Sequence, residues 1–107
     1  MDAVASRIVQ RQPAHRVVCA FLELTAPDLP TAVRQLVADG ARHITVLPLF
    51  LGVGRHARED LPVILAAIRL EHPETTVQLL RSAGEHPQMI DLLASLALEG
   101  RDDGRNI

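Results

Sequence analysis

The stretch Ile44–Pro62, ITVLPLFLGVGRHAREDLP, decides the fold of this 107-residue chain. Its apolar run Ile44–Leu51 is nearly continuous, which is typical of a strand covered on both faces in a parallel sheet. Pro48 indicates that regular pairing weakens near the end of that strand. A glycine-bearing loop follows, and Asp60-Leu61-Pro62 then predicts a helix start, because Asp caps free N–H groups and Pro fits a first turn.

The same strand-then-helix order recurs on both sides of this stretch. The apolar runs Val17–Leu24 and Thr76–Leu80 predict two more strands. Asp28-Leu29-Pro30 opens a second helical pattern in the same way, and Gly40 is its expected stop. Repeated strand-helix units with right-handed crossovers predict an α/β fold around a small parallel sheet.

Two further helices are expected at the ends of the chain. Asp2–Gln12 carries Val4, Ala5 and Ile8 on one face, and Pro13 ends this pattern. Pro87 precedes an apolar stripe of helical spacing, formed by Met89, Ile90, Leu93 and Leu96. We expect one domain over residues 1–107, with the polar tail 100–107 frayed.

Composition excludes several classes of partner. The net charge is −2, from 11 basic and 13 acidic residues, so no nucleic acid or anionic membrane is expected as partner. Aromatic residues make up only 2%, which disfavours base stacking. No apolar run approaches the length of a membrane span and no signal-peptide core is evident, so we expect a cytoplasmic location. Cys19, the single cysteine, is expected to be a buried small hydrophobe.

The five histidines fall on two edges of the predicted sheet. His15, His43 and His72 precede strands and are expected to be plain surface residues. His56 and His86 follow strands, at the carboxyl edge where open parallel sheets form their sites. His86 before Pro87 is also typical of a residue that ends a loop.

Glu23, near the end of the first predicted strand, is the most informative single residue. A buried carboxylate is costly unless it is paired or binds a cation. Glu23 either reaches solvent, pairs with Arg55 or Arg58, or joins His56, with or without His86, in holding a metal. The spacing alone is a weak metal signal, and the glycine loop lacks the residues of a phosphate-binding loop.

Three segments together resemble a known family. Val46–His56 followed by Glu59–Pro62 is similar to the "PLFL..G.H...DLP" signature of the small class II tetrapyrrole chelatases, the sirohydrochlorin cobaltochelatases and ferrochelatases. Ala20–Glu23 with Ala26–Leu29 resembles their "FLE...P.L" segment. Gly84–Pro87 resembles their late "LG.HP" turn.

The resemblance implies a three-layer chelatase-like fold, with a four-stranded parallel sheet flanked by helices. It implies insertion of Co²⁺, or of Fe²⁺ or Ni²⁺, into a sirohydrochlorin-type tetrapyrrole in cobalamin or sirohaem biosynthesis, by a homodimer. His56 matches the family's metal-binding histidine, and Glu23 matches the acid that assists metal delivery or proton removal. His86 receives no catalytic role from the resemblance.

One departure from the family pattern bears on activity. The family opens with a strand ending in "GHGS", whose histidine is another metal ligand, and this sequence has no such motif. About three of the four strands are therefore expected, and this 107-residue form is expected to be a poor chelatase. The alternative is a non-catalytic tetrapyrrole- or metal-binding module, or a structural dimer partner.

Overall fold

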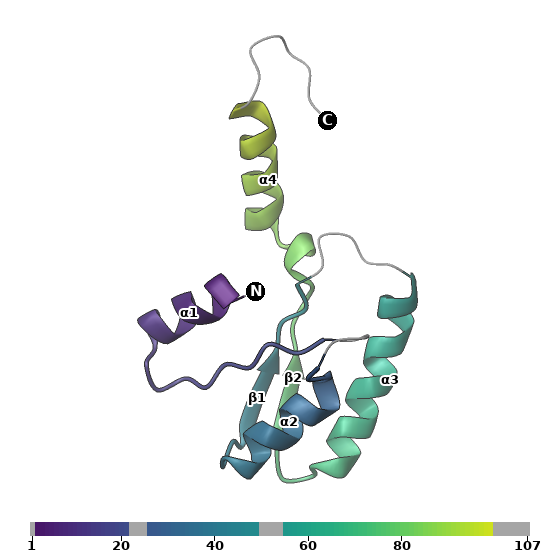
Figure 1. Cartoon of the computed structure of the whole chain (residues 1–107). Helices are drawn as coiled ribbons and strands as arrows, with labels where there is room; N and C mark the ends of the chain where they lie inside the picture. Colours follow the sequence, from purple (N-terminus) through teal and green to yellow (C-terminus); the bar gives the residue numbers. More distant parts are fainter. Residues whose placement is uncertain (1, 22–25, 50–54, 100–107) are drawn as a thin grey trace.

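The computed structural model describes residues 2–21, 26–49 and 55–99, with the side chains of 55–58 left out. Its elements follow one another in an order that Figure 1 shows: α1 (Asp2–Arg11), α2 (Leu29–Ala38), β1 (His43–Val46), α3 (Arg55–Glu71), β2 (Thr76–Leu79), the 3₁₀ helix η1 (Ala83–Glu85) and α4 (Pro87–Glu99). The tail predicted to fray, residues 100–107, lies outside the described residues.

β1 and β2 form a parallel pair, which confirms the predicted α/β class with a small parallel sheet. Ile44 lies opposite Val77 in the register. The Thr76 N–H donates to the Arg42 carbonyl at 2.8 Å, and the Leu80 N–H donates to the Val46 carbonyl at 2.9 Å. The α3 helix supplies the crossover that a parallel pair requires.

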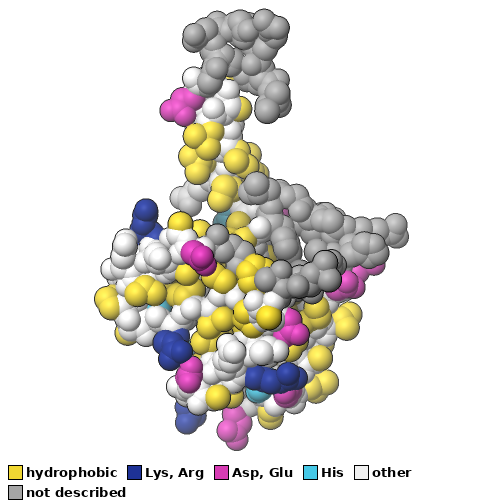
Figure 2. All heavy atoms as spheres, in the orientation of Figure 1, with side chains coloured by type: hydrophobic (Ala, Val, Ile, Leu, Met, Phe, Trp, Pro, Cys, Tyr) yellow, Lys and Arg dark blue, Asp and Glu magenta, His cyan; other side chains and the backbone are white. Residues whose placement is uncertain are grey.

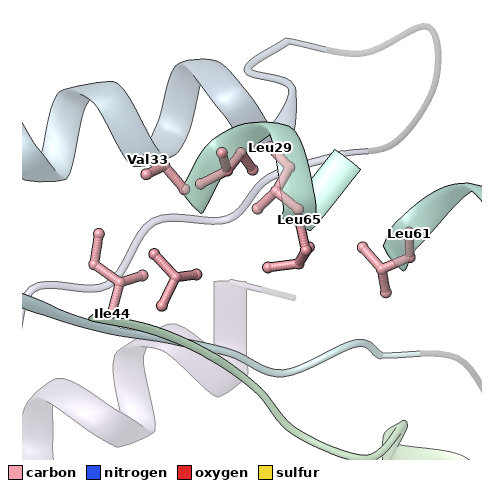
Figure 3. Close-up of a cluster of buried hydrophobic side chains, with 7 residues drawn as sticks. Leu29, Val33, Ile44, Leu61 and Leu65 are labelled. Atoms are coloured by element: carbon pink, nitrogen blue, oxygen red, sulfur yellow. The ribbon is translucent and has the colours of Figure 1, made fainter. Parts of the chain in front are cut away.

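The core lies between this sheet and the helices α2 and α3. Val33 of α2 and Leu65 and Ile68 of α3 are almost fully buried, with exposures of 1%, 0% and 1%. Ile44 and Val77 complete the cluster from the strands, and Figure 3 shows these apolar side chains converging. The hydrophobic effect of this cluster is what holds the helices on the sheet.

Only one face of the sheet is covered in the described part of the chain, so the prediction of strands covered on both faces is wrong. Each strand alternates, with Ile44 and Val77 buried while Thr45 and Gln78 are exposed. Covering a second face needs another packed layer. Here α4 follows η1 away from the strands and does not supply that layer (Figure 1).

The first predicted strand, Val17–Leu24, is not formed over its described part. Val17–Ala20 have no sheet partner among the described residues, and Phe21 makes one isolated bridge to Asp28. The remainder, residues 22–24, lies outside the described residues. A strand needs a neighbour to receive its backbone hydrogen bonds, and a cavity of about 350 Å³ separates this segment from β1.

Both predicted ends of α2 are confirmed. The Asp28 carboxylate accepts a hydrogen bond from the Thr31 N–H at 2.9 Å, which is an N-cap, and Pro30 lies in the first turn. Gly40 has φ = +98°, the left-handed conformation that a residue without Cβ adopts at low cost. Local signals therefore set both boundaries of this helix.

The predicted start of α3 is wrong. The helix begins at Arg55, so Asp60 lies inside it as an exposed residue rather than capping it, and Pro62 lies in the helix interior. The residues from Arg55 to Glu59 include good helix formers, which extend the helix upstream of the Asp-Leu-Pro signal. Pro62 removes one intrahelical hydrogen bond donor, which the long packed helix tolerates.

The two terminal helices form where predicted, but neither buries a residue. α4 leaves five large apolar side chains more than two-fifths exposed, which are Ile90, Leu92, Leu93, Leu96 and Leu98. Figure 2 shows apolar side chains along this projecting helix. Within the described ranges, no helix combines the length and apolarity needed to cross a bilayer.

Leu65→Ala should lower the free energy of unfolding by about 2–5 kcal/mol, because it leaves a cavity at the centre of the core. Leu70→Ala is the matched control, since Leu70 lies on the same helix and is 84% exposed. Its effect should stay within about 0.5 kcal/mol. Urea unfolding followed by circular dichroism measures both, and equal losses would contradict the proposed core.

Asp28→Asn should keep α2 capped at neutral pH, because Asn also caps helices, while removing the acid-dependent part of stability. Hydrogen bonds with Thr31, first to its side chain and then to its backbone, hold the pKa of Asp28 below 3.8. Its stabilising contribution is therefore complete above pH 3.8 and is lost as pH falls through the lowered pKa. As the pH is lowered, the midpoint temperature of thermal unfolding should fall more steeply for the parent than for the variant. Parallel profiles of midpoint temperature against pH would contradict this.

Candidate functional site

The carboxyl ends of β1 and β2 meet at one edge of the sheet, because the strands are parallel. Leu47–Leu49 leave β1 there, and Leu80–Ser82 leave β2. The Ala83 N–H donates to the Pro48 carbonyl at 2.8 Å, so the two segments stay bonded beyond the strands. Ser82 and Ala83 are buried at this contact, which gives the edge a packed base.

His56 lies in the first turn of α3, immediately after the loop that leaves β1. The backbone therefore places it at the carboxyl edge, as predicted from the strand order. Leu61 and Leu65 anchor the same helix in the core, with exposures of 8% and 0%. The side chain of His56 is not described, so its role as a metal ligand stays a prediction.

Glu23 lies outside the described residues, and its pairing with Arg55, Arg58 or a metal stays a prediction. The described chain on either side is joined by a hydrogen bond from the Phe21 N–H to the Pro27 carbonyl at 2.9 Å. Asp28 follows at once and caps α2. Phe21 and Pro27, the described residues joined by this bond, thus lie beside the amino-terminal end of α2.

His86 lies between η1 and α4 at the same edge and is half-buried. Its N–H donates to the Ala83 carbonyl at 3.2 Å, and its own carbonyl accepts from the Ile90 N–H at 3.0 Å. These bonds link the two helices, which agrees with a residue that ends a loop. Among the described residues, no three His, Cys, Asp or Glu side chains come together as a metal site.

The histidines at the opposite edge do not all behave alike. His15 and His43 are exposed, as expected of surface residues. The prediction is wrong for His72, whose side chain is only 11% exposed. Its Nε2 is buried without a hydrogen-bond partner in the described part of the chain, 4.0 Å from Glu71 Oε2. Packing at the end of α3 covers it, and sequence position gave no sign of this.

A cavity of about 350 Å³ lies beside β1, and no pattern in the sequence predicted it. Its described lining comes from α1, Val17–Phe21, α2, Ile44–Leu49 and Leu61 of α3, and none of these described residues is charged. Cys19 lies in this lining and is half-buried, so its prediction as a buried residue is wrong. Most of the described lining is apolar, which suits an apolar ligand better than a bare metal dication.

Several known proteins resemble this chain in sequence. A sirohydrochlorin cobaltochelatase from Methanococcus aeolicus is 32% identical over 68 residues, covering 64% of this chain and 48% of that protein. A sirohydrochlorin cobaltochelatase from Methanococcoides burtonii is 28% identical and covers 92% of this chain and 82% of that protein. A sirohydrochlorin ferrochelatase from Bacillus subtilis is 30% identical over 71 residues, covering 66% of this chain and 27% of that protein.

Two solved structures share the fold. A cobalamin biosynthesis CbiX protein from Marinobacter aquaeolei VT8 superposes with a TM-score of 0.70 at 27% identity, over 92% of this chain and 82% of that chain. SirB from Bacillus subtilis, in a structure with Fe³⁺, gives 0.65 at 25% identity, over 92% of this chain and 41% of that one. The CbiX family model matches residues 1–99, and the chain therefore belongs to the CbiX family.

Proposed function

We propose that this chain takes part in inserting a divalent metal, Co²⁺ first among the candidates, into a sirohydrochlorin-type tetrapyrrole. The match of the CbiX family to residues 1–99 carries the proposal. The relatives named above are sirohydrochlorin chelatases, for cobalt or for iron. We place this activity in the cytoplasm, where a lone cysteine such as Cys19 stays reduced.

His56 and Glu23 are the proposed working residues. Insertion of a dication replaces two pyrrole N–H protons, so the site has to hold the metal and accept protons. A neutral imidazole at His56 suits both tasks at neutral pH. A carboxylate at Glu23 lowers the electrostatic cost of bringing a dication to the ring and takes up a released proton.

Cobalt is proposed ahead of iron and nickel because of the chemistry of the donors and the names of the relatives. Nitrogen and oxygen ligands suit borderline divalent metals of the first transition row, and affinity alone does not separate them sharply. The relatives from Methanococcus aeolicus and Methanococcoides burtonii are both named cobaltochelatases. Fe²⁺ is the competing substrate, as in the relative from Bacillus subtilis.

His56→Ala and Glu23→Gln should each lower the rate of cobalt insertion into sirohydrochlorin by about 10–100-fold, as losses around metal sites commonly do. His56→Ala should also weaken Co²⁺ binding in a titration. Absorbance of the metallated ring measures the rate, and calorimetry measures the binding.

The matched controls lie at the other edge of the sheet. His43 begins β1 and Glu74 precedes β2, and both are exposed. His43→Ala and Glu74→Gln should therefore leave insertion and Co²⁺ binding unchanged. Equal losses in the controls would contradict the assignment, and Co²⁺ binding without any insertion in the parent would favour a non-catalytic binding module.

We also propose that the working form is a homodimer. α4 presents exposed apolar residues with no cover among the described residues, and Leu93 and Leu96 lie on its predicted stripe. Exposed apolar surfaces of this kind mark interaction sites. A second copy of the same helix offers a self-complementary apolar face, which is how two-fold interfaces form.

Leu93→Glu and Leu96→Glu should each shift the chain from dimer to monomer, because both put a charge on the proposed interface. Ser95→Glu is the matched control on the same exposed helix and should remain dimeric. Sedimentation equilibrium at micromolar to submillimolar concentration measures the mass. A monomeric parent chain over that range would overturn the dimer.

A further inference from the structure

The outer edge of β2 is occupied by a side chain instead of by another strand. Among the described residues β2 pairs with β1 alone, so its other edge borders no further strand. Arg69 of α3 reaches that edge, where its Nε and Nη2 donate to the Val77 carbonyl at 3.2 and 2.9 Å. Both bonds are partly buried. A helix side chain therefore takes the place that a neighbouring strand would take.

The register shows that the Val77 carbonyl belongs to the outer edge. The N–H groups of Thr76 and Leu80 donate to carbonyls of the chain that forms β1. Backbone groups of successive residues in a strand point to opposite edges. Val77 and Leu79, each an odd number of residues from both, therefore direct their N–H and C=O groups away from β1. Arg69 thus fills an acceptor that an added strand would need.

Arg69 also places a positive charge at this edge. A guanidinium stays protonated in proteins, and here it donates to a neutral carbonyl. Arg69 as a whole is exposed, so its charge remains hydrated. A strand that paired with β2 would have to break both bonds and cover this charge, which is costly. Charged side chains at the edge of a sheet are a known means of preventing edge-to-edge pairing.

Without Arg69 the outer edge of β2 would be complementary to itself. Two copies of β2 related by a two-fold axis would run antiparallel, with Gln78 opposite Gln78. Val77 of each copy would then lie opposite Leu79 of the other, in a pair that exchanges two backbone hydrogen bonds. The Val77 carbonyl would accept one of these bonds, and it is the same carbonyl that Arg69 now holds.

We propose that Arg69 keeps the outer edge of β2 closed to β2 of a second copy. A strand edge without such a device is a template for association. A chain with a second self-pairing surface, in addition to the α4 face proposed above, would join into open arrays instead of a closed pair. The proposal rests on the Arg69 bonds and is independent of the chelatase function.

A disulfide between two copies at position 78 would report the pairing directly. In the antiparallel arrangement this position forms a non-hydrogen-bonded pair, with Cα atoms about 4.5 Å apart, which a disulfide can span. The reporter chain is the full chain with Gln78→Cys, and with Cys19→Ala so that the new thiol is the only one. Oxidised glutathione drives the coupling, and a non-reducing gel measures the linked dimer.

In this reporter chain Arg69→Met should raise the initial rate of dimer coupling at least about tenfold, the factor typical of losing one charge-assisted hydrogen bond. Arg69→Gln, which lacks the charge, should also couple faster and serves as the second variant. Arg69→Lys keeps a charge and a donor and should couple as slowly as the parent reporter. Circular dichroism checks that each variant folds.

The matched control is Arg7→Met, which makes the same change of charge at an exposed position of α1 and should leave coupling slow. Equal coupling with and without Arg69 would overturn the proposal, and so would fast coupling in the control. A gain of mass in Arg69→Met without coupling at position 78 would mean that the edge pairs with another segment, which would overturn the two-fold pairing. None of these readouts uses a metal or a tetrapyrrole, so loss of the chelatase proposal would leave this one standing.

Discussion

The parallel pairing of β1 with β2 is the constraint on which the other elements depend. It sets Ile44 opposite Val77, so that both side chains face α2 and α3. A slip of one residue would turn these side chains to the open face and expose the core. The same pairing brings the chain after β1, which leads to His56, to the same edge as the chain after β2. The position of the candidate site therefore follows from the parallel pairing of β1 with β2.

The two faces of the β1–β2 sheet are covered unequally, and this leaves apolar side chains exposed in several places. One face carries a core centred on Leu65, while the opposite face leaves Thr45 and Gln78 exposed. Small domains bury a low fraction of their apolar surface even when complete. Here α1 and α4 contain no fully buried residue, so much of their apolar surface stays exposed within the described chain. The exposed apolar side chains of α4 are the part of that surface that the proposed homodimer would cover.

Local signals predicted local structure well. Asp28 and Gly40 marked the ends of α2, and Pro87 marked the start of α4, because capping and backbone preference act within a few residues. Pro62 misled because helix propensity upstream outweighed its usual position in a first turn. The strand predicted over Val17–Leu24 failed for another reason, since strand formation depends on a partner distant in sequence. The burial of His72 likewise depends on tertiary packing.

Strand order alone placed His56 at the carboxyl edge of the sheet, whereas Glu23 lies outside the described residues. His56 begins a helix held by Leu65 in the core. Glu23 follows Phe21 by two residues, and Phe21 ends the unpaired wall of the apolar cavity. Because a misplacement of about 1 Å can cost about 10²-fold in rate, the proposed role of His56 depends on the packing of Leu65, which anchors the helix that carries it.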